Sequence, residues 1–368
     1  MDNKYELDTP CLTIDVDILE QNLAAMQAVA RAAGKDLRPH AKTHKCSLLA
    51  KKQIQAGAIG VCTAKVSEAE VLADAGVSGI LVTGPVVSAQ KIRRLTAVLK
   101  KDPTVMVVVD NPENARRLDE AAQACRLSLD VLMDIDVGMG RTGVLPESAL
   151  ELAGHITKCR NLRLKGIQAY AGFVQHIRSY AERKQVSLTC MRRAADLLLA
   201  LQAKEPACKI FSGTGTGTYD IDIQIAELTE LQVGSYAVMD ADYLDNAAKD
   251  DAARFSGFKP ALTLLTTVVS VNRPEFVTVD AGLKALYRDG GVPFIVTPEF
   301  AHLKYGWFGD EYGKLSRAGN GNLPKLGTVL EVVTSHCDPT INQFDCFYAT
   351  RGEKVIDRWP IDLRGKSQ

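Results

Sequence analysis

Eight short apolar segments rich in β-branched residues recur along the chain and narrow the folds open to it. An opening strand at residues 11–17 precedes them, and each of the first six intervals between them carries an amphipathic helical period. Nearly continuous apolar runs are typical of parallel strands covered on both faces. Eight such strands with intervening helices favour a (β/α)8 barrel over a doubly wound sheet, which usually has about five or six strands. The segments are residues 37–42, 60–64, 80–84, 105–110, 130–135, 166–170, 209–214 and 230–236.

The helical patterns give approximate bounds for the connecting elements. The first helix is expected from Leu19 to Ala33, because Leu19, Leu23, Met26 and Ala30 form one apolar stripe. Asp17 is its expected N-terminal cap and Gly34 its C-terminal stop. Further helices are expected at 67–75, 88–100, 111–122 and 180–203.

The alternation of apolar strand segments with helical periods ends after Tyr243. Residues 245–259 are polar and without clear period, which indicates a linker or surface loop. The segments beyond them alternate like antiparallel strands joined by turns. The sequence therefore predicts an α/β protein in which a barrel is followed by a C-terminal β domain. The expected parts are an N-terminal strand at 1–16 that joins the β domain, the barrel at 17–245 and the β domain at 246–368.

Composition excludes several classes of protein. The 368 residues contain 44 Lys and Arg against 44 Asp and Glu, and this zero net charge argues against nucleic-acid or anionic-membrane partners. No apolar stretch approaches the roughly 20 residues of a membrane-spanning helix, and the first residues have no signal-peptide core. The nine cysteines are scattered without a CxxC pair, as expected of buried thiols in a reducing compartment. We therefore expect a cytoplasmic globular protein.

Polar and ionisable residues close several of the eight segments, at the barrel end where loops build active sites. Lys42 follows the first segment, between His40 and His44. A half-desolvated lysine near other cations is suited to forming a Schiff base, although spacing alone leaves a solvated loop lysine open. The two histidines lie outside a helix and lack the glutamate of a metalloprotease motif.

The run Gly213-Thr214-Gly215-Thr216-Gly217-Thr218 follows the seventh segment. Its free backbone N–H groups and threonine hydroxyls are suited to a phosphate, although a flexible turn explains the run equally well. Together with Gly234-Ser235 after the eighth segment, it indicates a phosphate-bearing cofactor, because barrels usually bind phosphate in these two loops.

His336-Cys337-Asp338 is expected to end a strand of the β domain. If a strand continues through this motif, His336 and Asp338 face the same side and Cys337 points away. Imidazole and carboxylate suit a divalent ion such as Mn²⁺, Mg²⁺, Co²⁺ or Zn²⁺. Two ligands alone are not a specific site, so an ordinary strand end before Pro339 stays open.

With these motifs in order, the sequence resembles the D-threonine aldolase/D-serine dehydratase family of fold-type III pyridoxal-phosphate enzymes, which are related to alanine racemase. The resemblance covers nearly the whole chain. The matching motifs include DTPCLTIDVDILEQNL, RPHAKTHK, DIDVGMGRTGV, SGTGTGT, ELQVGSYAVMDADY, VDAGLK and SHCDPT.

The resemblance implies a barrel that binds pyridoxal phosphate, and usually a homodimer. By matching motifs, Lys42 is the lysine that forms the Schiff base with the cofactor, and His336 and Asp338 are the metal ligands. The remaining cofactor residues implied are Thr216, Gly234 and Ser235 for the phosphate, Arg141 and Tyr170 for the pyridine ring, and Tyr243 in the lining of the site.

The third residue of the metal motif separates the two activities. Dehydratases of the family typically have His-Cys-Cys and use zinc, whereas aldolases have His-x-Asp, so Asp338 favours an aldolase with a harder ion such as Mn²⁺, Mg²⁺ or Co²⁺. Two positions depart from the family pattern. A glutamine that approaches the cofactor is replaced by Ala64, and the usual histidine of an Asp-Glu-His-Gly motif is Tyr312.

The resemblance implies cleavage of a D-β-hydroxy-α-amino acid to glycine and an aldehyde by a retro-aldol reaction. His176 or a metal-bound hydroxide would remove the proton of the β-hydroxyl. Dehydration of D-serine or of a 3-hydroxyaspartate stays open, as does a non-catalytic regulator that binds pyridoxal phosphate. A metal-only hydrolase is less consistent with the sequence, since the rim of the barrel lacks a multi-histidine cluster.

Overall fold

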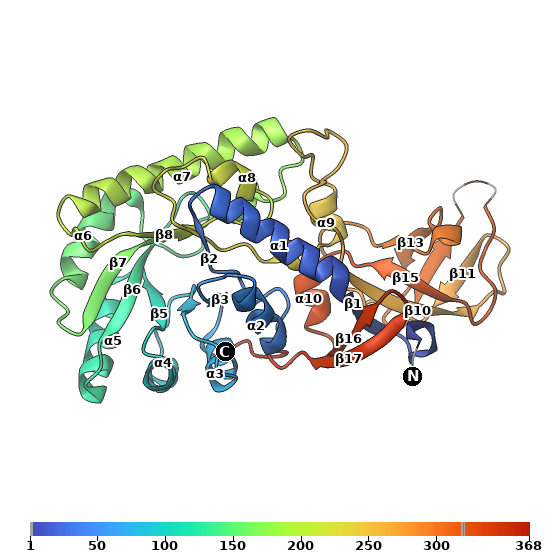
Figure 1. Cartoon of the computed structure of the whole chain (residues 1–368), viewed down its shortest axis with the longest axis horizontal. Coiled ribbons are helices and arrows are strands. Elements are labelled where there is room, and N and C mark those ends of the chain that lie inside the picture. Colours follow the sequence, from blue (N-terminus) through green and yellow to red (C-terminus); the bar gives the residue numbers. More distant parts are fainter. Residues whose placement is uncertain (1–2, 318, 320) are drawn as a thin grey trace. The chain divides into compact units, whose positions relative to one another are not determined.

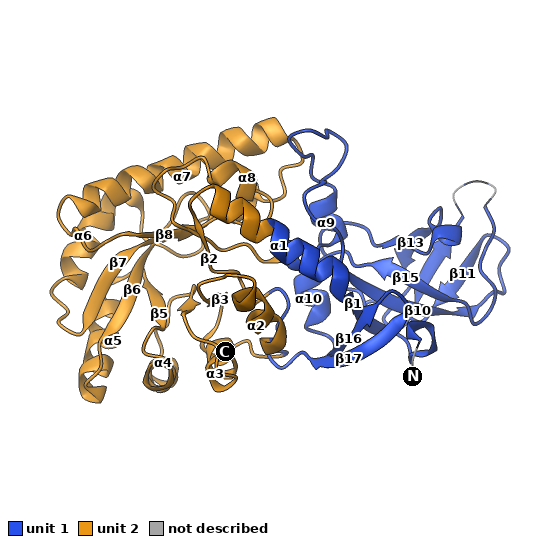
Figure 2. Ribbon diagram, in the orientation of Figure 1, with its two compact units in different colours: residues 1–25, 43–46, 235–364 blue, residues 26–42, 47–234, 365–368 orange. Residues whose placement is uncertain are grey.

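The computed structural model describes residues 3–317, 319 and 321–368 (Figure 1). The chain divides into two compact units, and both are discontinuous in sequence (Figure 2). The first, called the β unit here, comprises Met1–Ala25, Thr43–Cys46 and Ser235–Arg364. The second, called the barrel unit, comprises Met26–Lys42, Ser47–Gly234 and Gly365–Gln368.

The barrel unit is built on an eight-stranded parallel sheet in the order β2-β9-β8-β7-β6-β5-β4-β3. Between β2 and β3 the ring is completed by a parallel bridge from His40 to Cys62. The prediction of a (β/α)8 barrel followed by a β domain is confirmed. The strands are β2 (Asp36–Leu37), β3 (Val61–Thr63), β4 (Ile80–Val82), β5 (Met106–Val109), β6 (Leu129–Ile135), β7 (Leu162–Ala169), β8 (Ile210–Gly213) and β9 (Glu230–Leu231).

The first and last barrel strands are shorter than the sequence predicts. Only Asp36 and Leu37 form a ladder in β2, although the chain remains hydrogen-bonded to its neighbours as far as Ala41. In β9 the ladder ends at Leu231, and Ser235–Ala237 form a 3-10 helix, η3. Strand regularity is thus lost where the chain leaves the barrel at the polar end.

Helices lie around the parallel strands in Figure 1. Gly34 follows α1 with a left-handed φ of 65°, as expected of a helix stop. The expected cap at Asp17 is wrong, because α1 begins at Val16 and Asp15 Oδ1 accepts the N–H of Ile18. The helices are α1 (Val16–Ala32), α2 (Ser47–Gln55), α3 (Val66–Asp74), α4 (Ala89–Lys101), α5 (Pro112–Cys125), α6 (Pro146–Ile156), η2 (Gly172–Val174), α7 (Tyr180–Gln202) and α8 (Tyr219–Asp222).

The β unit contains a nine-stranded sheet in the order β11-β14-β13-β12-β15-β10-β1-β16-β17. The N-terminal strand β1 (Cys11–Asp15) lies between β10, to which it is antiparallel, and β16, to which it is parallel. The other strands are β10 (Leu262–Ser270), β11 (Phe276–Val279), β12 (Phe294–Ile295), β13 (Lys304–Trp307), β14 (Gly313–Ser316), β15 (Val329–Val333), β16 (Cys346–Arg351) and β17 (Lys354–Pro360).

The β unit also contains short helical elements. They are the 3-10 helices η1 (Lys4–Glu6), η3 and η4 (Pro298–Phe300), and the α-helices α9 (Ala241–Leu244) and α10 (Cys337–Ile341). The strand expected through His336-Cys337-Asp338 is wrong, because β15 ends at Val333 and α10 begins at Cys337.

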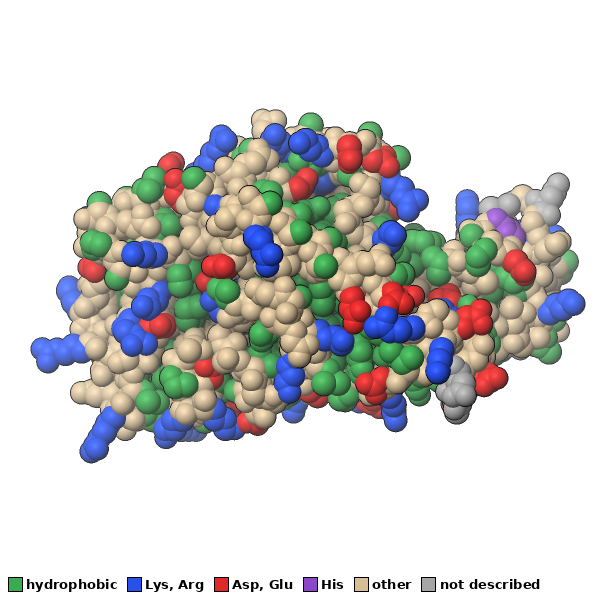
Figure 3. Space-filling view, viewed as in Figure 1, with side chains coloured by type: hydrophobic (Ala, Val, Ile, Leu, Met, Phe, Trp, Pro, Cys, Tyr) green, Lys and Arg blue, Asp and Glu red, His purple; other side chains and the backbone are tan. Residues whose placement is uncertain are grey.

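Positive and negative side chains are intermixed over the face shown in Figure 3, in keeping with the equal numbers of acidic and basic residues. Within the described residues, no helix has both the length and the apolar character needed to cross a membrane.

Candidate active site

Lys42 lies two residues after His40, whose bridge to Cys62 completes the barrel. His40 N–H donates to Val233 O (3.0 Å), while Ala41 N–H donates to Cys62 O (2.8 Å), so neighbours on both sides hold the chain that leads to the lysine. The backbone N–H of Lys42 donates to His40 Nδ1 (3.4 Å), and His40 Nε2 lies 3.1 Å from Thr83 Oγ1. The half-buried Lys42 is therefore at the carboxyl end of β2, where a barrel carries its chemistry.

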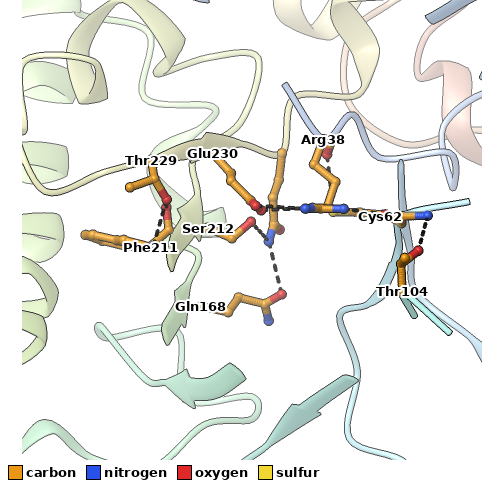
Figure 4. A network of polar contacts seen from close by, with 10 residues as sticks. Arg38, Cys62, Thr104, Gln168, Phe211, Ser212, Thr229 and Glu230 are labelled. Carbon is orange, nitrogen blue, oxygen red and sulfur yellow. Dashed lines mark hydrogen bonds and ion pairs between the residues drawn. The ribbon is translucent and has the colours of Figure 1, made fainter. Parts of the chain in front are cut away.

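The interior of the barrel changes from apolar to polar toward this end. Below, a buried apolar cluster consists of Cys62, Leu81, Met106, Val108 and Leu132. Above it, Gln168 Nε2 donates to Thr83 O (3.0 Å) and to Asp134 Oδ1 (2.9 Å). Gln232 Nε2 donates to Gln168 Oε1 (3.1 Å) and to Ser212 Oγ (3.0 Å), and Figure 4 labels these two acceptor residues. We call Asp134, Gln168, Ser212 and Gln232, together with His40 and Thr83, the polar floor.

Beside these residues, Arg38 and Glu230 form a buried bidentate ion pair, and Glu230 is in register with Ser212 of the neighbouring strand (Figure 4). Arg38 Nε and Nη2 donate to the two carboxylate oxygens at 2.9 and 2.8 Å, and Arg38 also donates to Gly79 O. A buried charge requires such complete pairing. This pair connects β2 and β9, and it is structural rather than part of the rim.

Arg141 lies in a loop that acidic side chains fix from below. Thr142 Oγ1 donates to Asp134 Oδ2 (2.9 Å), and Gly143 N–H donates to Asp110 Oδ2 (3.1 Å). Burial raises the pKa of Asp134 to about 6, although hydrogen bonds from Gln168 and Thr142 act in the other direction. Arg141 itself is exposed. The predicted pyridine contact is thus on a loop that is anchored to the barrel floor.

The glycine-threonine loop after β8 is packed closely on the segment after β7. A Cβ atom at Gly215 would lie 2.4 Å from Gln175 Oε1, and one at Gly217 would lie 2.4 Å from Gln175 O. The N–H of Gly217 donates to Gln175 Oε1 (2.9 Å), and that of Thr218 donates to Gly215 O (3.1 Å). The expectation that the backbone N–H groups of this loop are free is therefore wrong for these two residues.

Two threonine hydroxyls of the same loop also have internal partners. Thr214 Oγ1 and Thr218 Oγ1 donate to Asp222 Oδ2 at 2.5 and 2.6 Å. Burial raises the pKa of Asp222, against the effect of these hydroxyl donors. Thr216, which is also buried, lies between them. This arrangement assigns Thr214 and Thr218 to holding the loop, and Thr216 stays the predicted phosphate contact.

Tyr170 and His176 follow β7. Tyr170 is half-buried, and a Cβ atom at Gly172 would lie 2.8 Å from its ring. His176 is exposed in the link between η2 and α7. All the predicted site residues of the barrel unit thus follow the carboxyl ends of its strands, namely Lys42, Arg141, Tyr170, His176, Thr216 and Gly234.

The remaining predicted residues belong to the β unit. Asp240 accepts the N–H groups of Tyr243 (3.0 Å) and Cys337 (2.9 Å). Burial raises the pKa of Asp240, while nearby His336 and the two N–H donors act to lower it. The side chain of Ser235 is hydrogen-bonded to Cys337. The structure thereby brings Ser235 and Tyr243, predicted around the cofactor, to the segment that carries the predicted metal ligands.

His336 precedes α10 in an extended conformation, and Asp338 lies in its first turn. His336 Nε2 and Asp338 Oδ1 are 4.0 Å apart, with side-chain exposures of 24% and 18%. Although the strand is absent, the two side chains face each other, and Cys337 is fully buried. Within the described part of the chain, no group of three or more His, Cys, Asp or Glu residues could hold a metal ion. A divalent ion here would have two protein donors.

Several residues with evident roles escaped the sequence reasoning. Asp240 accepts the N–H of Cys337, and Asp289 Oδ2 lies 3.3 Å from His336 Nδ1. Both residues are distant from the metal motif in sequence, and no local pattern indicates them. Asp134 and Gln168 stand at strand ends and Gln175 follows η2, so the sequence indicated their position near the barrel rim but not their partners.

Comparison with known proteins agrees with these arrangements. The family signature described as "Alanine racemase, N-terminal domain" matches residues 14–242. A putative serine dehydratase domain matches residues 261–350.

Three relatives match nearly the whole chain. It is 39% identical to a 3-hydroxy-D-aspartate aldolase of Paracoccus denitrificans (strain Pd 1222), over 99% of this chain and 94% of that protein. It is 38% identical to a D-threonine aldolase of an Arthrobacter species, over 98% and 94%. Among solved structures, a D-threonine aldolase from Filomicrobium marinum superimposes with a TM-score of 0.94 at 36% identity, covering 100% of this chain and 98% of that one.

Proposed function

This chain belongs to the alanine racemase-like family that includes the D-threonine and 3-hydroxy-D-aspartate aldolases, and we propose that it is a carbon–carbon lyase. Its substrate is a D-β-hydroxy-α-amino acid, and its products are glycine and an aldehyde. Its cofactors are pyridoxal phosphate and a divalent ion, with Mn²⁺, Mg²⁺ or Co²⁺ favoured over Zn²⁺. By the same family resemblance, we propose a cytoplasmic homodimer.

The observation that carries this proposal is the pairing of His336 Nε2 with Asp338 Oδ1. One nitrogen and one carboxylate oxygen form a donor set that suits a harder divalent ion, and water or substrate oxygens fit the remaining positions. A thiolate donor would instead favour zinc. Cys337, between the two donors, is fully buried, and burial raises its thiol pKa well above the ordinary value.

The residues predicted around the cofactor have the chemistry to hold pyridoxal phosphate. Lys42 provides the amine at the carboxyl end of β2, and the buried hydroxyl of Thr216 stands in a loop whose glycines admit no Cβ atom. Hydroxyl and backbone N–H groups are ordinary phosphate donors. Thr216, Gly234 and Ser235 would hold the phosphate, Arg141 and Tyr170 would contact the pyridine ring, and Tyr243 would line the site.

When bound, the cofactor supplies an electron sink for the pair released from the Cα–Cβ bond, and the divalent ion lowers the pKa of the β-hydroxyl. Lys42 would hold the cofactor, and His336 and Asp338 would hold the ion. His176 takes the proton from the β-hydroxyl oxygen, and the proton that Cα gains completes glycine. The polar floor below Lys42 keeps its turn fixed, since His40 accepts the lysine N–H.

The first test uses the colour of the purified protein. We expect a yellow protein that converts D-threonine to glycine and acetaldehyde, and a colourless, inactive Lys42→Ala variant. A colourless wild-type protein with full activity would contradict the proposal. Ammonia with a 2-oxo acid as products would instead identify a dehydratase, and a coloured protein without either activity would identify a non-catalytic regulator.

Metal removal tests the second half of the proposal. We expect chelation to abolish glycine formation while the absorbance of bound pyridoxal phosphate remains, because the predicted metal ligands are separate from Lys42. Added Mn²⁺ should restore the activity. Unchanged activity in chelated protein would reject His336 and Asp338 as ligands of a catalytic ion.

A further inference from the structure

Asp289 faces the side of the His336 ring that is turned away from Asp338. Its Oδ2 lies 3.3 Å from His336 Nδ1, whereas His336 Nε2 lies 4.0 Å from Asp338 Oδ1. A carboxylate accepts hydrogen bonds, so Nδ1 carries the proton and Nε2 keeps its lone pair. We infer that Asp289 is a positioning residue, which fixes the tautomer and the orientation of His336 for metal binding.

The loop that carries Asp289 is fastened to both ends of the metal motif. Ser335 Oγ donates to Tyr287 O, and Tyr287 N–H donates to Thr340 Oγ1 (3.3 Å). These two contacts flank His336 and Asp338, so Tyr287 is held against the segment that bears both donors. Asp289 follows only two residues later. The backbone of Tyr287 therefore keeps the chain that leads to Asp289 beside the metal motif, while the Asp289 side chain itself is 62% exposed.

Two glycines continue the attachment beyond Asp289. A Cβ atom at Gly290, where φ is 78°, would lie 2.9 Å from Asp242 Cβ. One at Gly291 would lie 2.8 Å from the carbonyl carbon of Ala241. The backbones of Ala241 and Asp242 are in turn bonded to Thr334 O (2.9 Å) and Ser335 O (3.1 Å). The loop thus reaches the metal motif through α9 as well, which reduces its freedom to withdraw Asp289.

The geometry distinguishes positioning from direct metal binding. The two ring nitrogens of an imidazole point in divergent directions, so a carboxylate bound to Nδ1 is remote from an ion at Nε2. The described residues accordingly contain no three-donor metal cluster, even though Asp289 lies beside His336. A carboxylate that accepts from the second nitrogen of a metal-bound histidine orients the ring and raises its basicity. This is the role that we assign to Asp289.

The inference rests on the proposed metal site, so the test measures metal binding rather than turnover. The full-length protein with bound pyridoxal phosphate, without substrate, is titrated with Mn²⁺, and free Mn²⁺ is followed by electron paramagnetic resonance. The variants are Asp289→Ala, Asp289→Asn and His336→Ala. Asp345→Asn is the matched control, because Asp345 is an exposed carboxylate of the same unit that pairs with Arg364 (2.7 Å). The absorbance of bound pyridoxal phosphate and the circular dichroism spectrum verify that each variant is folded.

We expect Asp289→Ala to raise the Kd for Mn²⁺ by about 10–100-fold. Asp289→Asn should raise it by less than about tenfold, because the amide oxygen still accepts from Nδ1. His336→Ala should abolish tight binding, and Asp345→Asn should bind like the wild type.

Three results would overturn the inference. Wild-type affinity in Asp289→Ala, with binding lost in His336→Ala, would show that Asp289 does not position the histidine and would leave the proposed function intact. An Asp289→Asn variant as impaired as His336→Ala would identify Asp289 as a direct ligand. Wild-type affinity in His336→Ala would remove the metal site itself, and with it the metal part of the proposed function.

Discussion

The buried carboxyl group of Asp134 shows how single residues prepare the rim of this barrel. It accepts from Gln168 and Thr142 and so joins the polar floor to the loop that carries Arg141. The neighbouring loop residue Asp136 has a different environment. Although partial burial opposes it, N–H donors from Gly138, Gly140 and Met139 lower its pKa. Two carboxyl groups that are two residues apart thus have opposite pKa shifts.

These shifts predict opposite dependences of stability on pH. The pKa of Asp134 is raised from 3.8 to about 6, so the folded protein binds more protons than the unfolded chain between these values. Its contribution to stability therefore falls as pH rises from about 4 to about 6, and it stays low above. Between pH 4 and pH 7, Asp134→Asn should gain up to about 3 kcal/mol relative to the wild type. Urea denaturation at the two pH values measures this gain.

Asp136→Asn is the matched control for that experiment. Because the folded-state pKa of Asp136 is lowered, its stabilisation is present above the unfolded pKa and is lost as pH falls. The variant should therefore become less stable than the wild type as pH rises from 4 to 7. The same trend in both variants would contradict the assignment of opposite shifts.

At the scale of elements, the loop between β8 and α8 depends on close packing of its backbone. Its glycines lie against Gln175, and two of its hydroxyls are bound by Asp222. The sequence indicated a phosphate loop from the composition of this run and from its position after the seventh segment, together with Gly234-Ser235 after the eighth. It did not reveal that several of the donors serve the loop itself. That distinction requires the position of Asp222 in α8 and of Gln175 after η2, which the linear pattern does not contain.

Gly217→Ala tests this packing. The new Cβ atom would lie 2.4 Å from Gln175 O, a backbone atom that cannot move aside easily. We expect a loss of about 1–3 kcal/mol in the free energy of unfolding, with weaker binding of pyridoxal phosphate. Gly154→Ala in α6 is the control, because no atom lies within 4 Å of the place its Cβ would take and alanine favours a helix by about 0.5–1 kcal/mol. Equal stability of both variants would contradict the packing argument.

Across the full length of the chain, the two ends of the sequence meet in one sheet. The N-terminal strand β1 pairs with β10 and with β16, which lie more than 240 residues further along the chain. Its side chains Leu12 and Ile14 are fully buried. The β unit therefore cannot complete its core until both ends of the chain are present, which makes β1 a long-range element in folding.

Leu12→Ala measures how much β1 contributes to the free energy of unfolding. Removing a fully buried leucine side chain between two neighbouring strands should cost about 2–5 kcal/mol in the free energy of unfolding. Val269→Ala is the control, since Val269 in β10 is 41% exposed and should cost less than about 1 kcal/mol. Urea denaturation followed by circular dichroism distinguishes them. A small effect of Leu12→Ala would show that β1 contributes little to the core.

The amino-acid sequence was enough to predict the eight barrel strands, the helices between them and the motifs around Lys42 and His336. These features are local, because hydrophobic period and turn residues act over a few neighbouring positions. The strands β12, β13 and β14 could not be predicted, since they are two to four residues long and have no sustained alternation.

The three-dimensional structure was needed to show which residues that are distant in sequence contact each other. The ring is completed through His40 and Cys62, and the expected strand at the metal motif gives way to α10, where buried Asp240 accepts the N–H of Cys337. Asp289 reaches His336 across 47 residues of sequence. The physical reason is the same in each case: buried hydrogen-bonding groups must find partners, and the fold alone sets which distant residue supplies them.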